Sequence, residues 1–178
     1  MKTLYVWDLG VRLFHWSLAA AFLANAFIVD DESDLHQYMG YFVMSLLLFR
    51  LLWGFIGNQY ARFRAFPLSK SACLKQVEDI VLERHTLHIG HTPLGSVMIY
   101  NLLISLALLT FSGFLMTTDL FWGTEWTEEL HEICVSWVEL SVVLHIAAVI
   151  FESKRTGVNL PKAMLNGYKT VPETHPAD

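Results

Sequence analysis

The sequence predicts an all-α integral membrane protein built as a four-helix bundle, and three observations lead to this prediction. Of the 178 residues, 54% are hydrophobic and only 16% are charged, which is unusual for a soluble domain. The apolar residues gather in four stretches, each long enough to cross a hydrocarbon core of about 30 Å as a helix. The basic residues all fall on one side if the chain crosses four times. We therefore expect a single membrane domain over residues 1–178.

The four expected spans cover residues 11–29, 35–56, 93–116 and 130–151. They are too long, and too uniformly apolar, to be the alternating strands of a membrane barrel. A loop of residues 57–92 separates the second and third spans, and residues 152–178 form a tail. Apolar residues at helical spacing in residues 69–83 predict a helix on the membrane surface. A second such helix is expected over residues 158–168.

The charge distribution predicts the orientation in the membrane. All twelve Lys and Arg residues belong to the side that holds the termini and the long loop. The two short connections on the other side are acidic instead, with Asp30, Asp31, Glu32, Asp34, Asp119, Glu125, Glu128 and Glu129. The positive-inside rule then predicts a multi-pass protein of the bacterial inner membrane, with both termini cytoplasmic and the acidic connections periplasmic.

Four histidines lie inside or at the edges of the expected spans, where an imidazole is costly unless something uses it. On the last span, His131 and His145 are 14 residues apart, which places them near one face and about 21 Å apart along the helix. Depth then pairs His36 with His131 on the periplasmic side and His15 with His145 on the cytoplasmic side. Each pair can supply both axial ligands of one haem iron. The alternative is that they are hydrogen-bonded histidines of the bundle core.

The cysteines and two arginines also bear on how a haem would be held. Neither cysteine lies in a Cys-x-x-Cys-His motif, so a haem would be held non-covalently. Arg50 follows His36 by 14 residues and reaches the depth of the cytoplasmic pair, where a haem propionate would satisfy its charge. The alternative is that Arg50 extends to the nearby interface. Arg12 is a weaker candidate for a propionate.

Four groups of residues, spread over nearly the whole chain, carry a family resemblance. They are Val6-Trp7-Asp8 with Arg12, His15 and Trp16; His36 with Gly40-Tyr41 and the run Arg50-Leu51-Leu52-Trp53-Gly54-Phe55; His91-Thr92-Pro93-Leu94-Gly95; and His131 and His145 with Glu152-Ser153. The chain resembles the bacterial cytochrome b561 family, which is similar to the cytochrome b subunits of nickel–iron hydrogenases. The resemblance implies two haems b held by the four histidines, and quinone or quinol as the redox partner in the membrane.

A quinone or proton site is considered at His91, Thr92 and Glu139. The family motif often reads His-Asn-Pro-Leu-Gly, so the threonine at position 92 weakens the case for a quinone hydrogen bond there. With His85 and His88, His91 could exchange protons beside the cytoplasmic haem. The alternatives are a solvated loop and a metal site formed by the three histidines.

Glu139 lies in the middle of the last expected span, where a carboxylate is a functional candidate. A proton or quinone role is one interpretation. The other is a carboxylate hydrogen-bonded inside the bundle, and the polar residues considered as its partners are Asn25, Ser45, Asn101 and Ser105.

The leading hypothesis is a di-haem b-type cytochrome that transfers electrons across the membrane between the quinone pool and a periplasmic redox partner. The alternatives are a superoxide:quinone oxidoreductase, a membrane anchor of a hydrogenase-like complex, and a haem-free transporter or channel whose histidines relay protons. The sequence leaves open whether the protein is an electron carrier or a quinone-linked enzyme, and whether it forms oligomers.

The acidic periplasmic connections favour a basic partner such as a soluble cytochrome c. Their charge also follows from topology alone, because the positive-inside rule excludes Lys and Arg from them. Membrane lipid is the expected surrounding medium. Nucleic-acid binding has no support, since topology already accounts for the basic residues.

Overall fold

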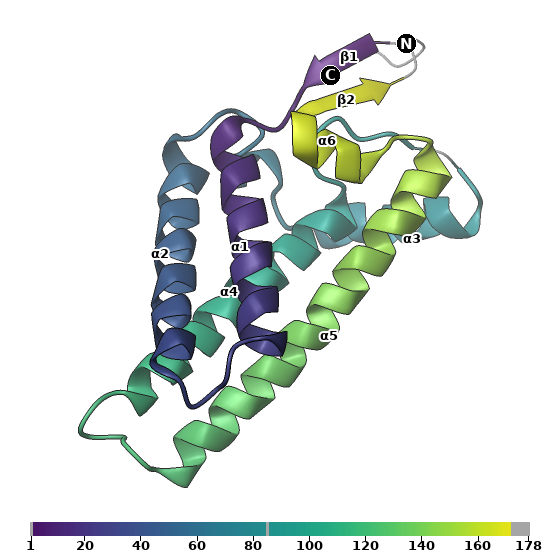
Figure 1. Cartoon of the computed structure of the whole chain (residues 1–178). Helices are drawn as coiled ribbons and strands as arrows, with labels where there is room; N and C mark the ends of the chain where they lie inside the picture. Colours follow the sequence, from purple (N-terminus) through teal and green to yellow (C-terminus); the bar gives the residue numbers. More distant parts are fainter. Residues whose placement is uncertain (1, 85, 172–178) are drawn as a thin grey trace. The chain divides into compact units, whose positions relative to one another are not determined.

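The computed structural model describes residues 2–84 and 86–171, and helices dominate it (Figure 1). In chain order the elements are β1 (Lys2–Tyr5), α1 (Leu9–Phe27), α2 (Asp34–Ile56), the 3-10 turn η1 (Phe63–Ala65), α3 (Lys70–Val81), α4 (Pro93–Met116), α5 (Glu125–Thr156), α6 (Leu160–Asn166) and β2 (Tyr168–Val171).

A helix occupies each expected span, although some ends differ. The helix expected over residues 93–116 coincides with α4, whereas α5 begins and ends several residues beyond the expected 130–151. In the described part of the chain, three helices are long and apolar enough to cross a membrane, namely α2, α4 and α5. The 19-residue α1 is not among them, because Arg12, His15 and Asn25 lower its hydropathy. A fourth crossing by α1 therefore stays a prediction.

The three candidate spans expose most of their apolar surface. Only 17% of the most hydropathic window of each helix is buried within the chain. Large side chains such as Leu48, Phe55 and Leu144 are more than half exposed, at 59%, 68% and 51%. A water-soluble domain rarely leaves so much contiguous apolar area uncovered. Lipid chains are the natural cover for these helices.

A small antiparallel sheet joins the two ends of the chain, and the all-α prediction missed it. Lys2 lies opposite Val171, and Tyr5 lies opposite Tyr168. Figure 1 shows β1 and β2 side by side next to α6. Each strand has only four residues, which is too short for a convincing alternation. Pairing between opposite ends of a chain also leaves no local signal in either segment.

Contacts divide the chain into two compact units. Of the described residues, the first comprises 2–12, 53–84, 86–99 and 144–171, and the second comprises 13–52 and 100–143. Each of the four long helices contributes residues to both units. The single membrane domain expected from the sequence stays a prediction.

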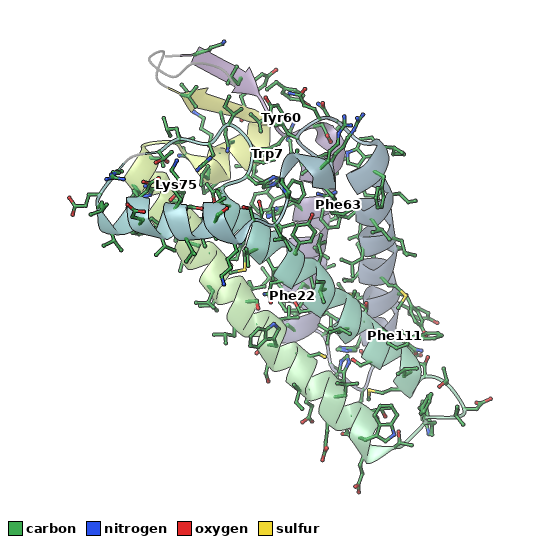
Figure 2. The ribbon with its side chains drawn as sticks, turned by 180° about the vertical axis from the view of Figure 1, so that it is seen from behind. Trp7, Phe22, Tyr60, Phe63, Lys75 and Phe111 are labelled. Carbon is green, nitrogen blue, oxygen red and sulfur yellow. The ribbon has the colours of Figure 1, made fainter. Side chains whose placement is uncertain are left out.

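The core of the first unit forms around the Val6-Trp7-Asp8 motif. Its buried members are Val6, Trp7, Val11, Ala61 and Ala163, and Leu4, Trp53, Tyr60, Ile89 and Met164 pack against them. Figure 2 labels Trp7 and Tyr60 from this core.

Asp8 fixes the start of α1 in this unit. Its Oδ1 accepts hydrogen bonds from the backbone N–H of Val11, at 2.9 Å, and from the indole of Trp53, at 3.1 Å. Asp8 is therefore an N-cap that also holds the last part of α2. Its side chain is 9% exposed. The motif that suggested the family thus has a structural explanation here.

The surface helices expected over residues 69–83 and 158–168 correspond to α3 and α6. Ser69 caps α3 by accepting a hydrogen bond from the N–H of Ala72, and Asn159 caps α6 by accepting one from Lys162. Buried Gln76 on α3 accepts a hydrogen bond of 2.8 Å from the backbone N–H of Leu94. The first turn of α4 has no intrahelical partner for that N–H, so the contact fastens α3 to the start of α4.

The core of the second unit lies between the middle parts of the long helices. Its buried members are Phe22, labelled in Figure 2, with Leu106, Leu109, Cys134 and Val138. Asn101 links α4 to α5, because it donates to Ser141 Oγ at 2.8 Å and accepts from the indole of Trp137 at 3.2 Å. The hydroxyls of Tyr41 on α2 and Thr117 on α4 lie 3.1 Å apart. Polar contacts of this kind supply specific pairing between helices in lipid.

Candidate functional site

The second unit brings His36 of α2 beside His131 of α5. Their ring centroids are 6.4 Å apart, and the ring planes cross at 68°. These are the two histidines that depth paired on the periplasmic side. A metal–imidazole bond is about 2 Å long, so an ion held by both rings separates the two ligating nitrogens by about 4 Å and the ring centres by somewhat more. The observed separation fits one metal ion between the rings.

Ser112 of α4 determines which nitrogen of His131 can face such an ion. Its Oγ lies 3.0 Å from Nδ1 of His131 and donates its own hydrogen to the carbonyl of Leu109 at 2.9 Å. A hydroxyl has one hydrogen, so towards the ring Ser112 acts as the acceptor and Nδ1 as the donor. Nε2 of His131 then carries the lone pair. Metal-binding histidines commonly have their second nitrogen held in this way.

Two glycines and one buried nitrogen lie near the two histidines. A Cβ at Gly113 would lie 3.1 Å from Cε1 of His131, so the ring packs directly on α4. A Cβ at Gly40, one turn after His36, would meet nothing within 4 Å. Nδ1 of His36 is buried and has no hydrogen-bond partner among the described residues, which is costly for the chain alone. The residues present therefore fit a metal-centred group that the polypeptide does not itself supply.

The other predicted pair is divided between the two units. His15 lies on α1 in the second unit and contacts Trp16 edge to face, with ring centroids 5.1 Å apart. His145 lies on α5 in the first unit. His131 and His145 do share one continuous helix, as the spacing argument requires. The pairing of His15 with His145 stays a prediction.

The two candidate arginines have different surroundings. Arg50 belongs to the second unit and is only 4% exposed, which does not fit a side chain extended into water. Burial at this level favours a role for its charge inside the protein. Arg12 donates from Nη2 to the carbonyl of Leu165, so part of its guanidinium is used within the first unit. A propionate contact for either arginine stays a prediction.

Thr92 has a clear structural role as the N-cap of α4. Its Oγ1 accepts a hydrogen bond of 3.0 Å from the N–H of Gly95, and Pro93 occupies the first helical position. A Cβ at Gly95 would lie 2.9 Å from Oγ1 of Thr92, so the cap itself requires a glycine there. Asn and Thr are both good caps, and capping explains this position without a quinone contact.

His91 packs between two aromatic rings of the first unit, 4.5 Å from the centroid of Trp7 and 4.5 Å from that of Phe66. In the same unit, desolvation by burial lowers the pKa of His88, and the nearby carboxylate of Glu152 opposes this shift. His85 lies outside the described residues. Because the three-histidine metal site considered above includes His85, that alternative lies outside the described residues and stays untested.

Lys169, which sequence reasoning did not single out, lies against the same loop. Its Nζ donates to the carbonyl of Gly90 at 2.7 Å and lies 5.2 Å from the ring centroid of Trp7. The side chain is buried on β2, and desolvation lowers its pKa to about 8. Its burial depends on its place in the β1–β2 sheet, which no local pattern predicts, so the sequence carried no signal for it.

Glu139 is partly buried on α5 in the second unit. The four polar residues considered as its partners bond elsewhere: Asn25 to the carbonyl of His36, Ser45 to that of Phe42, Ser105 to that of Asn101, and Asn101 to Trp137 and Ser141. None of these bonds reaches Glu139, so a carboxylate held by one of the four gains no support from the described residues and stays a prediction. A proton or quinone role for Glu139 stays a prediction.

Comparison with known proteins now assigns the chain. A family model described as prokaryotic cytochrome b561 matches residues 6–167. The chain belongs to the prokaryotic cytochrome b561 family. This confirms the resemblance seen in the sequence and identifies the protein as a membrane cytochrome with b-type haem, whose general role is electron transfer. Haem b is the cofactor of this family, and its position beside His36 and His131 stays a prediction.

Two curated relatives of this b561 cytochrome are named as hydrogenase subunits. The "Probable Ni/Fe-hydrogenase B-type cytochrome subunit" of Cupriavidus necator is 23% identical over 96% of this chain and 88% of its own length. The "Probable Ni/Fe-hydrogenase 1 B-type cytochrome subunit" of Escherichia coli strain K12 is 21% identical over 93% of this chain and 90% of its own length. No solved structure matches the chain.

Proposed function

We propose that this b561 cytochrome holds two haems b and transfers electrons across the bacterial inner membrane between the quinone pool and a periplasmic redox partner. His36 with His131, and His15 with His145, are the proposed ligand pairs. The observation that carries the proposal is the neighbouring pair of rings, with centroids 6.4 Å apart and planes crossing at 68°, and the contact of His131 with Ser112. Held by two histidines in this way, haem b would supply one-electron transfer chemistry.

The chain's own residues prepare this site. Ser112 holds the His131 ring in one tautomer, and Gly113 allows that ring to pack on α4. Gly40 leaves open space one turn from His36. On the other side, buried Arg50 is proposed to neutralise a propionate, which is a charge-assisted contact. Arg12 is the second candidate for that role.

The two ends of the electron path are proposed from charge. The basic loop and both termini are placed in the cytoplasm, and the acidic connections in the periplasm. Quinone is placed near the cytoplasmic haem, with His91 and Glu139 as candidates for proton exchange. A basic periplasmic cytochrome c suits the acidic side, and salt should slow its reaction with the reduced protein. Rates that are equal for basic and acidic cytochromes c at every salt concentration would exclude this partner.

A second candidate is a membrane anchor of a hydrogenase-type complex. Its support is that relatives named as hydrogenase cytochrome subunits align with 93 to 96% of this chain. Affinity purification in mild detergent distinguishes the two functions. A large hydrogenase subunit in stoichiometric amount favours the anchor, whereas an active cytochrome without such a subunit favours the free-standing electron carrier.

Haem counting on ligand variants tests the proposal most directly. Pyridine haemochrome analysis should find two haems b per wild-type chain and one in each of the His36→Ala, His131→Ala, His15→Ala and His145→Ala variants. His88→Ala is the matched control and should keep both haems. Loss of both haems from a folded single variant would contradict the pairing. Full haem content in His36→Ala or His131→Ala would contradict the site itself.

A further inference from the structure

A pocket of about 170 Å³ lies at the end of α2, in the first unit. None of the candidate haem ligands lines it. Its lining residues are Gly54, Phe55, Arg62, Phe63 and Arg64. Figure 2 labels Phe63 from this pocket. A Cβ at Gly54 would lie 2.1 Å from the Phe63 ring, so that ring rests directly on the α2 backbone. Glycine at position 54 thus makes the aromatic wall possible.

The lining of the pocket combines two aromatic rings with two arginines. The ring centroids of Phe55 and Phe63 are 5.5 Å apart, edge to face, and Phe55 is 68% exposed. Arg62 donates from Nε to the carbonyl of Gly57 at 2.7 Å, which restrains its guanidinium group. Within residues 2–84 and 86–171, no carboxylate forms an ion pair with Arg62 or Arg64. Two positive charges beside the exposed Phe55 ring and the half-buried Phe63 ring favour an anion with an apolar part.

The position of the pocket identifies the class of that anion. Gly54 and Phe55 belong to the last turn of α2, one of the three helices apolar enough to span the membrane. The end of a span lies at the level of the lipid headgroups. Arginine prefers phosphate because its planar donors can contact two oxygens at once.

We propose that this pocket binds an anionic phospholipid. Arg62 and Arg64 contact the headgroup phosphate, and Phe55 and Phe63 contact the start of an acyl chain. Anionic lipid is concentrated on the cytoplasmic leaflet, where the charge pattern of this chain also places the pocket. The proposal is independent of the identity of the quinone and of the redox partner.

Binding of dioctanoyl phosphatidylglycerol to the detergent-solubilised holoprotein tests the proposal. Each basic side chain near a membrane surface contributes about fivefold to the binding of anionic lipid, so Arg64→Gln should weaken binding about fivefold and the Arg62→Gln/Arg64→Gln double variant about 30-fold. The glutamine at position 62 can still donate to Gly57. Lys75→Gln on α3, which removes an exposed charge outside the pocket, is the matched control and should change binding by less than about twofold. Haem content should be unchanged in all variants.

Two comparisons identify the ligand. Dioctanoyl phosphatidylcholine should bind more weakly than phosphatidylglycerol, and inorganic phosphate at the same concentration should not compete. Equal affinity for the two lipids would overturn the proposal. So would wild-type affinity in the double variant, an equal loss in Lys75→Gln, or competition by inorganic phosphate as effective as that by lipid.

Discussion

Replacement of Ser112 by alanine is the sharpest test of how the protein holds His131. Ser112 is 1% exposed and makes two contacts, one to Nδ1 of His131 and one to the carbonyl of Leu109. The carbonyl of Leu109 keeps the helical position in which it normally accepts a backbone hydrogen bond. The part-buried imidazole N–H, in contrast, loses its serine acceptor. The loss should therefore fall almost entirely on the histidine.

The size of the effect follows from the hydrogen bond that is lost. An acceptor on Nδ1–H strengthens the other nitrogen as an electron donor, and removal of such a partner typically weakens metal binding by 10- to 100-fold, roughly. A hydrogen bond of about 1 kcal/mol that favours the oxidised iron corresponds to about 40 mV for one electron. Ser112→Ala should thus weaken haem retention at the His36–His131 site and raise its midpoint potential by some tens of millivolts.

Potentiometric titration of the purified protein, followed in the visible spectrum, measures this shift. Ser105→Ala is the matched control, because Ser105 is also buried on α4 and donates to a carbonyl of its own helix, that of Asn101. Two unchanged midpoints in Ser112→Ala would refute the proposed tautomer of His131. An equal shift in Ser105→Ala would show that the effect comes from helix packing and not from the hydrogen bond.

Substitutions at three other residues have defined outcomes. Arg50→Leu should lower the midpoint of the haem proposed at the His15–His145 site, because a buried cation near the iron disfavours the more positive oxidised state; Arg50→Lys should retain most of the wild-type value. Folding lowers the pKa of Lys169 from 10.5 to about 8, so between these pH values the unfolded chain binds more protons than the folded chain. The free energy of unfolding should therefore rise from pH 8 to pH 10.5 in the wild type but not in Lys169→Gln. Asn101→Leu removes the bonds to Trp137 and Ser141 and should cost about 1 kcal/mol in a detergent unfolding titration, whereas an unchanged unfolding curve would mean that these bonds do not stabilise the α4–α5 contact.

Local features of the sequence predicted the helices and suggested the principal candidate residues. Long apolar stretches and capping residues are local features, so the positions of α2 and α4 could be predicted within one residue. His36 and His131 could be predicted as neighbours from their depth in the membrane alone. Residues at equal depth on helices that cross the same bilayer lie at the same level of the bundle. Family membership could be recognised because the motifs are short, local features of the sequence.

The structural roles of those motifs become clear only in the tertiary structure. Asp8 and Thr92, both parts of the family motifs, cap helices, and Asp8 also binds the Trp53 indole. Ser112 and His131 are 19 residues apart along the chain, and they meet only because α4 packs against α5. The β1–β2 sheet and the burial of Lys169 join opposite ends of the chain. Contacts of this kind depend on the three-dimensional path of the backbone, and periodicity within one segment carries no information about them.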